Sequence, residues 1–267
     1  MSRFSEKRLE MKDMDMLAAQ TSMVHSLNPL SKLLVTLCYI MAVVSFPKYN
    51  LSGLMPMILY PVLMYQLAGI PVSLCFVKLK VVLPLVCAVG IVNPFFDDTP
   101  VLQIGNVVIS GGILSMLTLM LKGIFSLMAS FLLIATTSID SVCAALRKVH
   151  VPDMMVTLLL LTYRYVGMMI EEVGVMYDAY MLRAPGQKGI HVSAWGSFLG
   201  QLLLRAMDRG EELYNSMLLR GYCGEFPHAA FAPFNRNSGI YSVLCIISFW
   251  ILRTVNLAEL LGAFFVR

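Results

Sequence analysis

Residues 107–135 read VVISGGILSMLTLMLKGIFSLMASFLLIA, and this apolar run decides the fold. A helix needs about 20 residues to cross the ~30 Å hydrocarbon core of a bilayer. Because the run is nearly thirty residues long, we expect a transmembrane helix that is either steeply tilted or longer than the membrane. Its one charged residue, Lys122, is expected to snorkel or to lie in a water-accessible gap, and a functional role is the alternative.

The composition of the whole chain agrees with a membrane protein. It has 267 residues, of which 58% are hydrophobic and 13% charged, whereas about a quarter of the residues of a soluble domain are charged. The net charge is +4, and the basic residues stand beside apolar segments, so they indicate topology rather than a nucleic-acid surface. Membrane lipid is therefore an expected partner and nucleic acid is not.

Four further apolar segments complete the predicted membrane part. They are residues 31–46, 51–70, 79–96 and 240–252. Pro56 and Pro61 fall in the second segment and should kink it unless a neighbouring helix or water satisfies the freed carbonyls. The tail 257–266 is too short to assign. We therefore expect an all-α polytopic membrane protein with about five transmembrane helices and, between the fourth and the fifth, a long polar helical region.

Loop charge predicts the orientation, because cytoplasmic loops collect Lys and Arg. The N-terminal arm and the loop before the third segment are basic, and the next loop is acidic. The charges are Arg3, Lys7, Arg8, Lys12, Lys78 and Lys80 against Asp97 and Asp98. No short apolar core with a small-residue cleavage site follows the first charges, so we expect a retained N-terminus.

This orientation divides the chain into four parts. Residues 1–30 form a cytoplasmic arm, and residues 31–135 hold transmembrane helices one to four. Residues 136–237 form a cytoplasmic region, which agrees with its many arginines, and residues 238–267 hold the last transmembrane helix and the tail. The chain is thus expected in a cell membrane, with several passes.

The cytoplasmic region is predicted to begin with a short amphipathic helix over residues 138–150. Asp140 lies near its start and Arg147-Lys148 in its last turn, an arrangement that suits the helix dipole. A second helix starts at Pro152 and runs to about Leu182. A third runs from a Ser193 cap to Arg220.

Gly196 and Gly200 are four residues apart in the third helix and so share one face. Another helix could approach this face closely, and we expect the two long helices to cross there. A chance spacing is the alternative.

A short pattern occurs twice, each time before a helix stop that contains glycine. The two copies are Tyr177-Asp178-Ala179-Tyr180-Met181-Leu182-Arg183 and Tyr214-Asn215-Ser216-Met217-Leu218-Leu219-Arg220. A single arginine there could simply complement the negative end of the helix dipole. The repeated spacing favours docking to a partner protein instead. Arginine suits such docking, because its planar guanidinium pairs bidentately with carboxylates and stays charged in a partly dry groove.

The chain resembles the transmembrane T component of energy-coupling factor (ECF) transporters, the family that includes CbiQ-type cobalt transport proteins. The resemblance covers nearly the whole chain. It rests on the two repeats and on the segments His25-Ser26-Leu27-Asn28-Pro29-Leu30-Ser31-Lys32, Ala145-Leu146-Arg147-Lys148-Val149-His150-Val151-Pro152 and Leu161-Thr162-Tyr163-Arg164-Tyr165 with Glu171-Glu172.

The resemblance implies a function. The family's T component is the membrane scaffold of a bacterial or archaeal importer for a vitamin or a transition-metal ion. Two crossing cytoplasmic coupling helices link a substrate-binding S component to two ATP-binding-cassette ATPases, and each helix ends in an Ala-Arg-Gly motif whose arginine enters an ATPase. Arg183 with Ala184 and Arg220 with Gly221 stand at these positions, although Leu182 and Leu219 replace the alanine and the first glycine is displaced.

The sequence also lacks features of other classes. It contains no G-x-x-x-x-G-K-[ST] phosphate loop, so ATP hydrolysis must come from another subunit and the chain is not itself expected to be an enzyme. The histidines and cysteines stand at no metal-ligand spacing, and no cofactor is expected. A self-sufficient secondary carrier remains the alternative, although the apolar segments hold almost no acidic groups for an ion relay. An intramembrane enzyme would need a convergent polar cluster within them.

Overall fold

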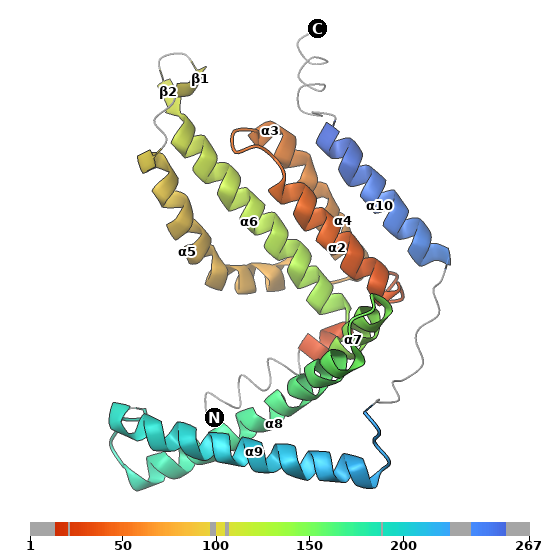
Figure 1. Ribbon diagram of the computed structural model, residues 1–267. Coiled ribbons are helices and arrows are strands. Elements are labelled where there is room, and N and C mark those ends of the chain that lie inside the picture. Colours follow the sequence, from red (N-terminus) through yellow and green to blue (C-terminus); the bar gives the residue numbers. More distant parts are fainter. Residues whose placement is uncertain are drawn as a thin grey trace. The chain divides into compact units, whose positions relative to one another are not determined.

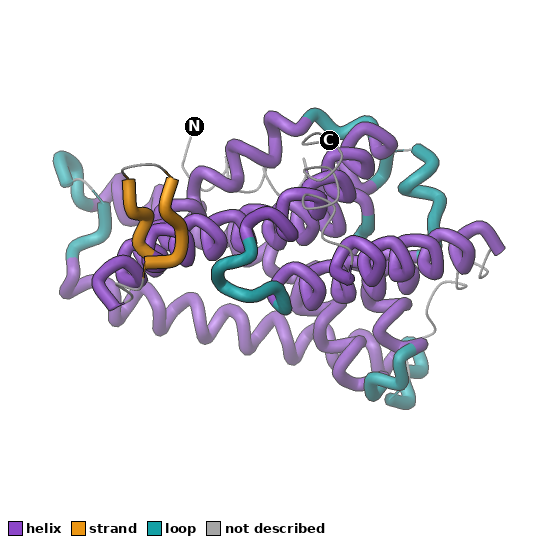
Figure 2. Tube along the Cα trace, turned by 90° about the horizontal axis from the view of Figure 1, so that it is seen from above, coloured by secondary structure: helices purple, strands orange, loops and turns teal. Residues whose placement is uncertain are grey.

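The computed structural model describes residues 14–20, 22–96, 100–104, 107–187, 189–224 and 236–254. These residues are largely helical (Figures 1 and 2). The elements are α2 (Pro29–Val44), α3 (Leu51–Leu54), the 3-10 helix η1 (Met55–Ile58), α4 (Leu59–Ala68), α5 (Val72–Phe96), β1 (Pro100–Ile104), β2 (Val107–Ser110), α6 (Gly111–Thr136), α7 (Ile139–Lys148), α8 (Asp153–Arg183), the 3-10 helix η2 (Val192–Ala194), α9 (Trp195–Leu219) and α10 (Arg236–Thr254).

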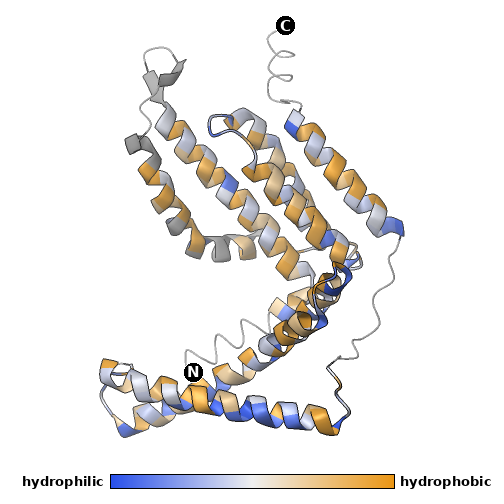
Figure 3. Cartoon of the chain, viewed as in Figure 1, coloured by the Kyte–Doolittle hydropathy of each residue, from blue (hydrophilic) through white to orange (hydrophobic). Residues whose placement is uncertain are grey.

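The chain divides into two compact units, and the boundary between α6 and α7 falls between Thr137 and Ser138. One unit contains α2 to α6 and α10, and the other contains α7 to α9. Figure 3 shows mostly apolar residues along α2, α6 and α10, and many polar ones along α9. That the first unit lies in the membrane and the second in the cytoplasm stays a prediction.

Three helical stretches of the described chain are long and apolar enough to cross a membrane: Leu51–Ala68, Gly111–Thr136 and Asp153–Arg183. Two shorter apolar helices, Pro29–Val44 and Val82–Val92, add to them. The predicted class, a helical polytopic membrane protein, is confirmed. The third of these long stretches is α8, which the loop charges assign to the cytoplasm.

Two sequence predictions about the middle of the chain are wrong. Residues 107–110 form β2, which pairs antiparallel with β1 in the register Ile104↔Val107, so the long apolar helix begins only at Gly111. The β-branched run Val107-Val108-Ile109 favours a strand. Lys78 and Lys80 lie within α5 rather than in a loop, because that helix already starts at Val72.

The second apolar segment is interrupted at Pro56, which lies in a 3-10 turn. A 3-10 turn, η1, separates α3 from α4. Pro61 has no N–H for the carbonyl of Met57, four residues earlier. The hydroxyl of Tyr39 on α2 donates to this carbonyl at 2.9 Å. The neighbouring helix therefore satisfies the group that the proline frees, and Tyr39 is itself fully buried.

Aromatic side chains join α10 to this helix pair. The ring centroid of Tyr39 lies 4.8 Å from that of Tyr60 and 5.2 Å from that of Phe249. At the other end of α2, the N–H of Asn28 donates to the hydroxyl of Ser238 at 3.0 Å. Residues 240–252, predicted as the last span, thus form the middle of a helix that packs on α2.

Two lysines connect α2 and α6, because each lysine caps the C-terminal end of the other helix. The Nζ of Lys32, on the first turn of α2, donates to the carbonyl of Thr136 at the end of α6, at 2.8 Å. The Nζ of Lys122 on α6 donates to the carbonyl of Val44, the last residue of α2, at 3.1 Å and to that of Phe46, just after the helix, at 2.5 Å. A cation is favourable there because helix C-termini carry partial negative charge and unpaired carbonyls. The structure therefore assigns Lys122 to helix capping.

Candidate coupling and docking site

The second unit begins with α7, which forms as the sequence predicts. The side chain of Ser138 caps its first turn by accepting from the N–H of Ser141. Arg147 in the last turn forms a two-bond ion pair with Asp153, the first residue of α8, with Nε to Oδ1 at 2.5 Å and Nη2 to Oδ2 at 3.2 Å. This pair ties the end of α7 to the start of α8 and fixes the turn between them.

The N-terminal segment belongs to the same unit as these helices. Its Asp15 accepts a hydrogen bond from the hydroxyl of Tyr163 on α8 at 2.7 Å. Tyr163 belongs to the Leu161-Thr162-Tyr163-Arg164-Tyr165 segment that carries the family resemblance. The contact therefore places residue 15 and the long helix α8 in one body.

The helices α8 and α9 form an antiparallel pair joined by a short link. Tyr180, from the first repeat, forms two hydrogen bonds with this link. Its hydroxyl donates to Oε1 of Gln187 at 3.0 Å and accepts from the N–H of His191 at 3.3 Å. Further along, Arg205 on α9 pairs with Glu172 on α8. Both side chains are partly exposed, so the pair fixes register more than it adds stability.

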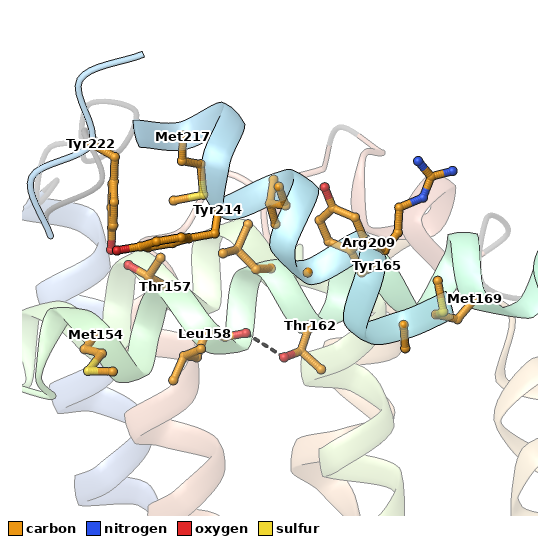
Figure 4. Close-up of a pocket in the computed structure, with 14 residues that line it drawn as sticks. Met154, Thr157, Leu158, Thr162, Tyr165, Met169, Arg209, Tyr214, Met217 and Tyr222 are labelled. Carbon is orange, nitrogen blue, oxygen red and sulfur yellow. Dashed lines mark hydrogen bonds between the residues drawn. The ribbon is translucent and has the colours of Figure 1, made fainter. Parts of the chain in front are cut away.

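A cavity of about 430 Å³ lies between the first half of α8 and the second half of α9 (Figure 4). Most of its lining is apolar. Leu158, Tyr165 and Met169 line it from α8, and Tyr214 and Met217 line it from α9. The end of α9 thus lies beside the start of α8, as an antiparallel arrangement requires. Flexible methionines on both walls could re-pack if the helices shift.

The end of α9 is a complete Schellman motif around Arg220. The N–H of Tyr222 donates to the carbonyl of Met217 at 3.0 Å, and that of Gly221 to Leu218 at 2.9 Å. Gly221 has φ +82°, a left-handed conformation that glycine adopts without strain. Tyr222 and Met217 also line the cavity together (Figure 4). The glycine after the second arginine is therefore explained by the helix stop.

The end of α8 is built differently. Its last helical residue is Arg183, and the N–H of Ala184 donates to the carbonyl of Tyr180 at 3.1 Å. The left-handed glycine comes three residues after the arginine, at Gly186 with φ +92°. The displaced glycine of the first repeat thus corresponds to a looser helix end, and the two arginines stand in unequal settings.

Both predicted docking arginines are exposed. Because the end of α9 lies beside the start of α8, Arg183 and Arg220 stand at opposite ends of the pair. At 1.5 Å per residue, the length of α8 separates them by roughly 45 Å. Each is preceded by a leucine that is also exposed, Leu182 at 83% and Leu219 at 90%. The sequence identified these leucines only as departures from the family pattern.

Gly196 and Gly200 face open space. A Cβ built on either of them meets nothing within 4 Å among the described residues. The contacts between α8 and α9 that the structure shows lie further along, at Arg205 and around Gly210. That these glycines mark a close helix crossing therefore stays a prediction, and a partner's helix is the remaining candidate for the contact.

No three His, Cys, Asp or Glu residues of the described chain come together in a way that could hold a metal ion. Cys143 is buried in α7, where burial, together with the carboxylate of Asp140, raises the pKa of its thiol.

A family model and two known proteins match parts of this chain. A family model described as CbiQ, cobalt transport protein, matches residues 20–229. An uncharacterized protein of Methanocaldococcus jannaschii is 33% identical over 96 residues, which is 35% of this chain and 32% of that protein. A protein of Methanocorpusculum labreanum named as a fused cobalt transport protein, CbiMQ, is 28% identical over 95 residues, 35% of this chain and 16% of that protein. The matches thus span a third or less of these relatives.

Proposed function

This chain belongs to the CbiQ family of cobalt transport proteins, and on that premise we propose that it is the transmembrane scaffold and energy-coupling subunit of an ATP-driven ECF importer. Two ATP-binding-cassette ATPases dock on Arg183 and Arg220 from the cytoplasm. A substrate-binding S component lies against the scaffold and reads the cargo, a vitamin or a transition-metal ion. The name of the family favours cobalt as the cargo. Catalysis of ATP hydrolysis belongs to the ATPases.

One observation carries this proposal: two exposed arginines end the two helices of one antiparallel pair, at opposite ends of it. A cation that served only its own helix dipole would not require a matching second copy at the same position of the other helix. Two ATPases, each bound at one end of the rigid pair of α8 and α9, would be held apart by the length of α8. When ATP binding brings the ATPases together, they would push on both ends of this helix pair at once.

The proposal places α8 outside the bilayer although its composition would allow it to cross. The neighbouring α9 carries Arg205, Asp208, Arg209, Glu211 and Glu212 within eight residues. Charges at this density cannot enter lipid. Because Glu172 of α8 pairs with Arg205, α8 stays with α9 on the aqueous side, and its exposed apolar residues are left to contact the membrane face or the S component.

The same placement puts the N-terminus in the cytoplasm. Asp15 contacts Tyr163 of α8, so the segment around residue 15 lies on the same side of the membrane as the coupling helices. The loop charges lead to the same side independently, through the basic N-terminal arm and the many arginines of residues 136–237.

The proposal is tested by purifying the tagged full-length chain from its own organism and measuring uptake. We expect two ATP-binding-cassette ATPases in the complex and ATP-driven uptake of radioactive cobalt or of a vitamin by proteoliposomes that contain it. Arg220→Glu should reduce ATPase capture and uptake sharply, because it reverses the docking charge, whereas Arg209→Glu on the same helix should not. An unaltered complex with unaltered uptake in Arg220→Glu would contradict the docking role.

A further inference from the structure

Leu182 and Leu219 are among the most exposed large hydrophobic side chains of the described residues, at 83% and 90%. Single exposed leucines are common and need no explanation. These two differ from scattered cases because each directly precedes the arginine that ends a long helix, at the same position of the two sequence repeats. The same exposure at both repeats points to a shared use.

The position of Leu219 excludes a role in the packing of α9. A side chain in a helix shares its face with the residues four and seven positions earlier. For Leu219 these are Asn215 and Glu212, which are both polar and exposed. The cavity facing α8 is lined instead by residues such as Leu213 and Met217. Leu219 thus stands on the polar side of the helix, where the described residues of its own unit leave it exposed.

Leu182 occupies the matching position on α8. Four residues before it stands Asp178, which aligns with Asn215 in the other repeat and is also exposed. Val175, seven residues before it, is 64% exposed. The last turns of both helices therefore present the same pair of groups to the surroundings: an apolar side chain of four carbons and, next to it, a guanidinium.

We propose that Leu182 and Leu219 are the apolar anchors of the two docking sites and that they determine which ATPases this chain accepts. The inference rests on the proposed function, since the occupant is the ATPase that receives each arginine. Arginine supplies attraction and orientation through its charge. Leucine supplies apolar area that is buried only in the complex, and it requires a pocket that an alanine at this position would leave partly empty.

The chemistry of the partner follows from this pair of groups. Each ATPase must present an acidic or carbonyl-rich groove for the guanidinium, with an apolar pocket directly beside it that is large enough for a leucine side chain. An ATPase adapted to an alanine at this position would meet a steric clash instead. The leucines thus favour the chain's own ATPases and exclude others, so that one side chain provides both attraction and rejection.

The test measures binding of the ATPases that co-purify with the wild-type chain, produced separately and titrated against the full-length chain in nanodiscs. Leu182→Ala and Leu219→Ala should each raise the Kd at their own end about tenfold, as expected when a central apolar anchor of an interface is truncated. Val192→Ala is the matched control, because Val192 is also 83% exposed but lies outside both repeats. Its Kd should stay within about twofold of the wild type.

The dependence of the Kd on ionic strength distinguishes the role of the leucines from that of the arginines. The Kd of Arg220→Gln should lose most of its dependence on ionic strength, whereas the Kd of Leu219→Ala should keep the wild-type dependence at weaker affinity. Equal binding by the leucine variants and the wild type would overturn the inference, and so would an equal loss in Val192→Ala. A wild-type chain that captures no ATPase would instead refute the proposed function, and the wild-type titration shows this directly.

Discussion

The backbone N–H of Tyr222 donates to the carbonyl of Met217 at 3.0 Å, across Arg220, one of the two proposed docking arginines. This bond closes α9 and sets the direction in which Arg220 leaves the helix. It depends on Gly221, whose φ of +82° is unfavourable for any residue with a Cβ.

Gly221→Ala should therefore lower the stability of the α9 end by about 1 kcal/mol and weaken ATPase capture. The matched control is Gly210→Ala, in the interior of the same helix, where an added Cβ meets nothing within 4 Å. That change should raise stability by about 0.4 to 1 kcal/mol. Melting temperatures of both purified variants, with the wild type, check the opposite signs. Equal shifts in one direction would show that the closing motif has no special role.

Replacing Lys32 by Met should destabilise the chain by about 1 to 3 kcal/mol, because the carbonyl of Thr136 loses a charged donor in a buried place. Hydrogen exchange resolves the site of the change. Lys32→Met should speed exchange in the last turn of α6, and Lys122→Met in the last turn of α2. Lys32→Arg should restore part of the protection, and identical exchange patterns in the two methionine variants would rule out reciprocal capping.

The cysteines of the second unit allow a test of its packing. Cys143 is fully buried, whereas Cys223 is exposed. The thiolate is the reactive form, and burial and Asp140 raise the pKa of the Cys143 thiol. In single-cysteine variants, maleimide should therefore modify Cys223 quickly and Cys143 slowly. The rate at Cys143 should still be rising with pH above the pKa of an ordinary thiol, which is about 8.5. Fast labelling of Cys143 at neutral pH would show that α7 is packed differently.

Labelling of Cys223 also shows on which side of the membrane α7 to α9 lie. A membrane-impermeant maleimide should label it in inside-out vesicles and leave it unlabelled in intact cells. The opposite pattern would place α7 to α9 outside the cell and would remove the ATPase docking proposal.

Gly196→Leu tests a predicted helix contact that the described residues of the chain do not make. Since a Cβ there meets no described residue within 4 Å, the melting temperature of the isolated chain should change little. If a partner's helix packs on this face, the variant should lose assembly of the complete transporter. Normal assembly and uptake would mean that Gly196 and Gly200 have no role in a helix crossing.

The sequence predicted the elements that depend on local chemistry. Apolar runs and proline positions located α2, the broken helix with Pro56 and Pro61, and α8 to within a few residues. It could not predict the β2 strand, because an apolar run such as residues 107–110 is compatible with either a strand or a helix. Charge alone favoured a loop for Lys78 and Lys80, whereas α5 runs through both, and no helix breaker separates them from the apolar residues that follow.

At the candidate site, the sequence located the arginines but not their surroundings. In the other unit, the partners of Lys122 lie 76 and 78 residues away, a distance along the chain that no local pattern spans. The exposure of Leu182 and Leu219 depends on which face of each helix turns to its neighbour. The sequence placed Gly196 and Gly200 correctly on one face, but it could not tell whether the chain itself or a partner covers that face.

The central claim is that each arginine holds one ATPase. Native mass spectrometry of the complex without nucleotide tests it directly, by counting ATPase copies on the wild type, on Arg183→Glu, on Arg220→Glu and on the double variant. We predict two copies on the wild type, one on each single variant and none on the double variant. Two copies retained on the double variant would contradict the claim.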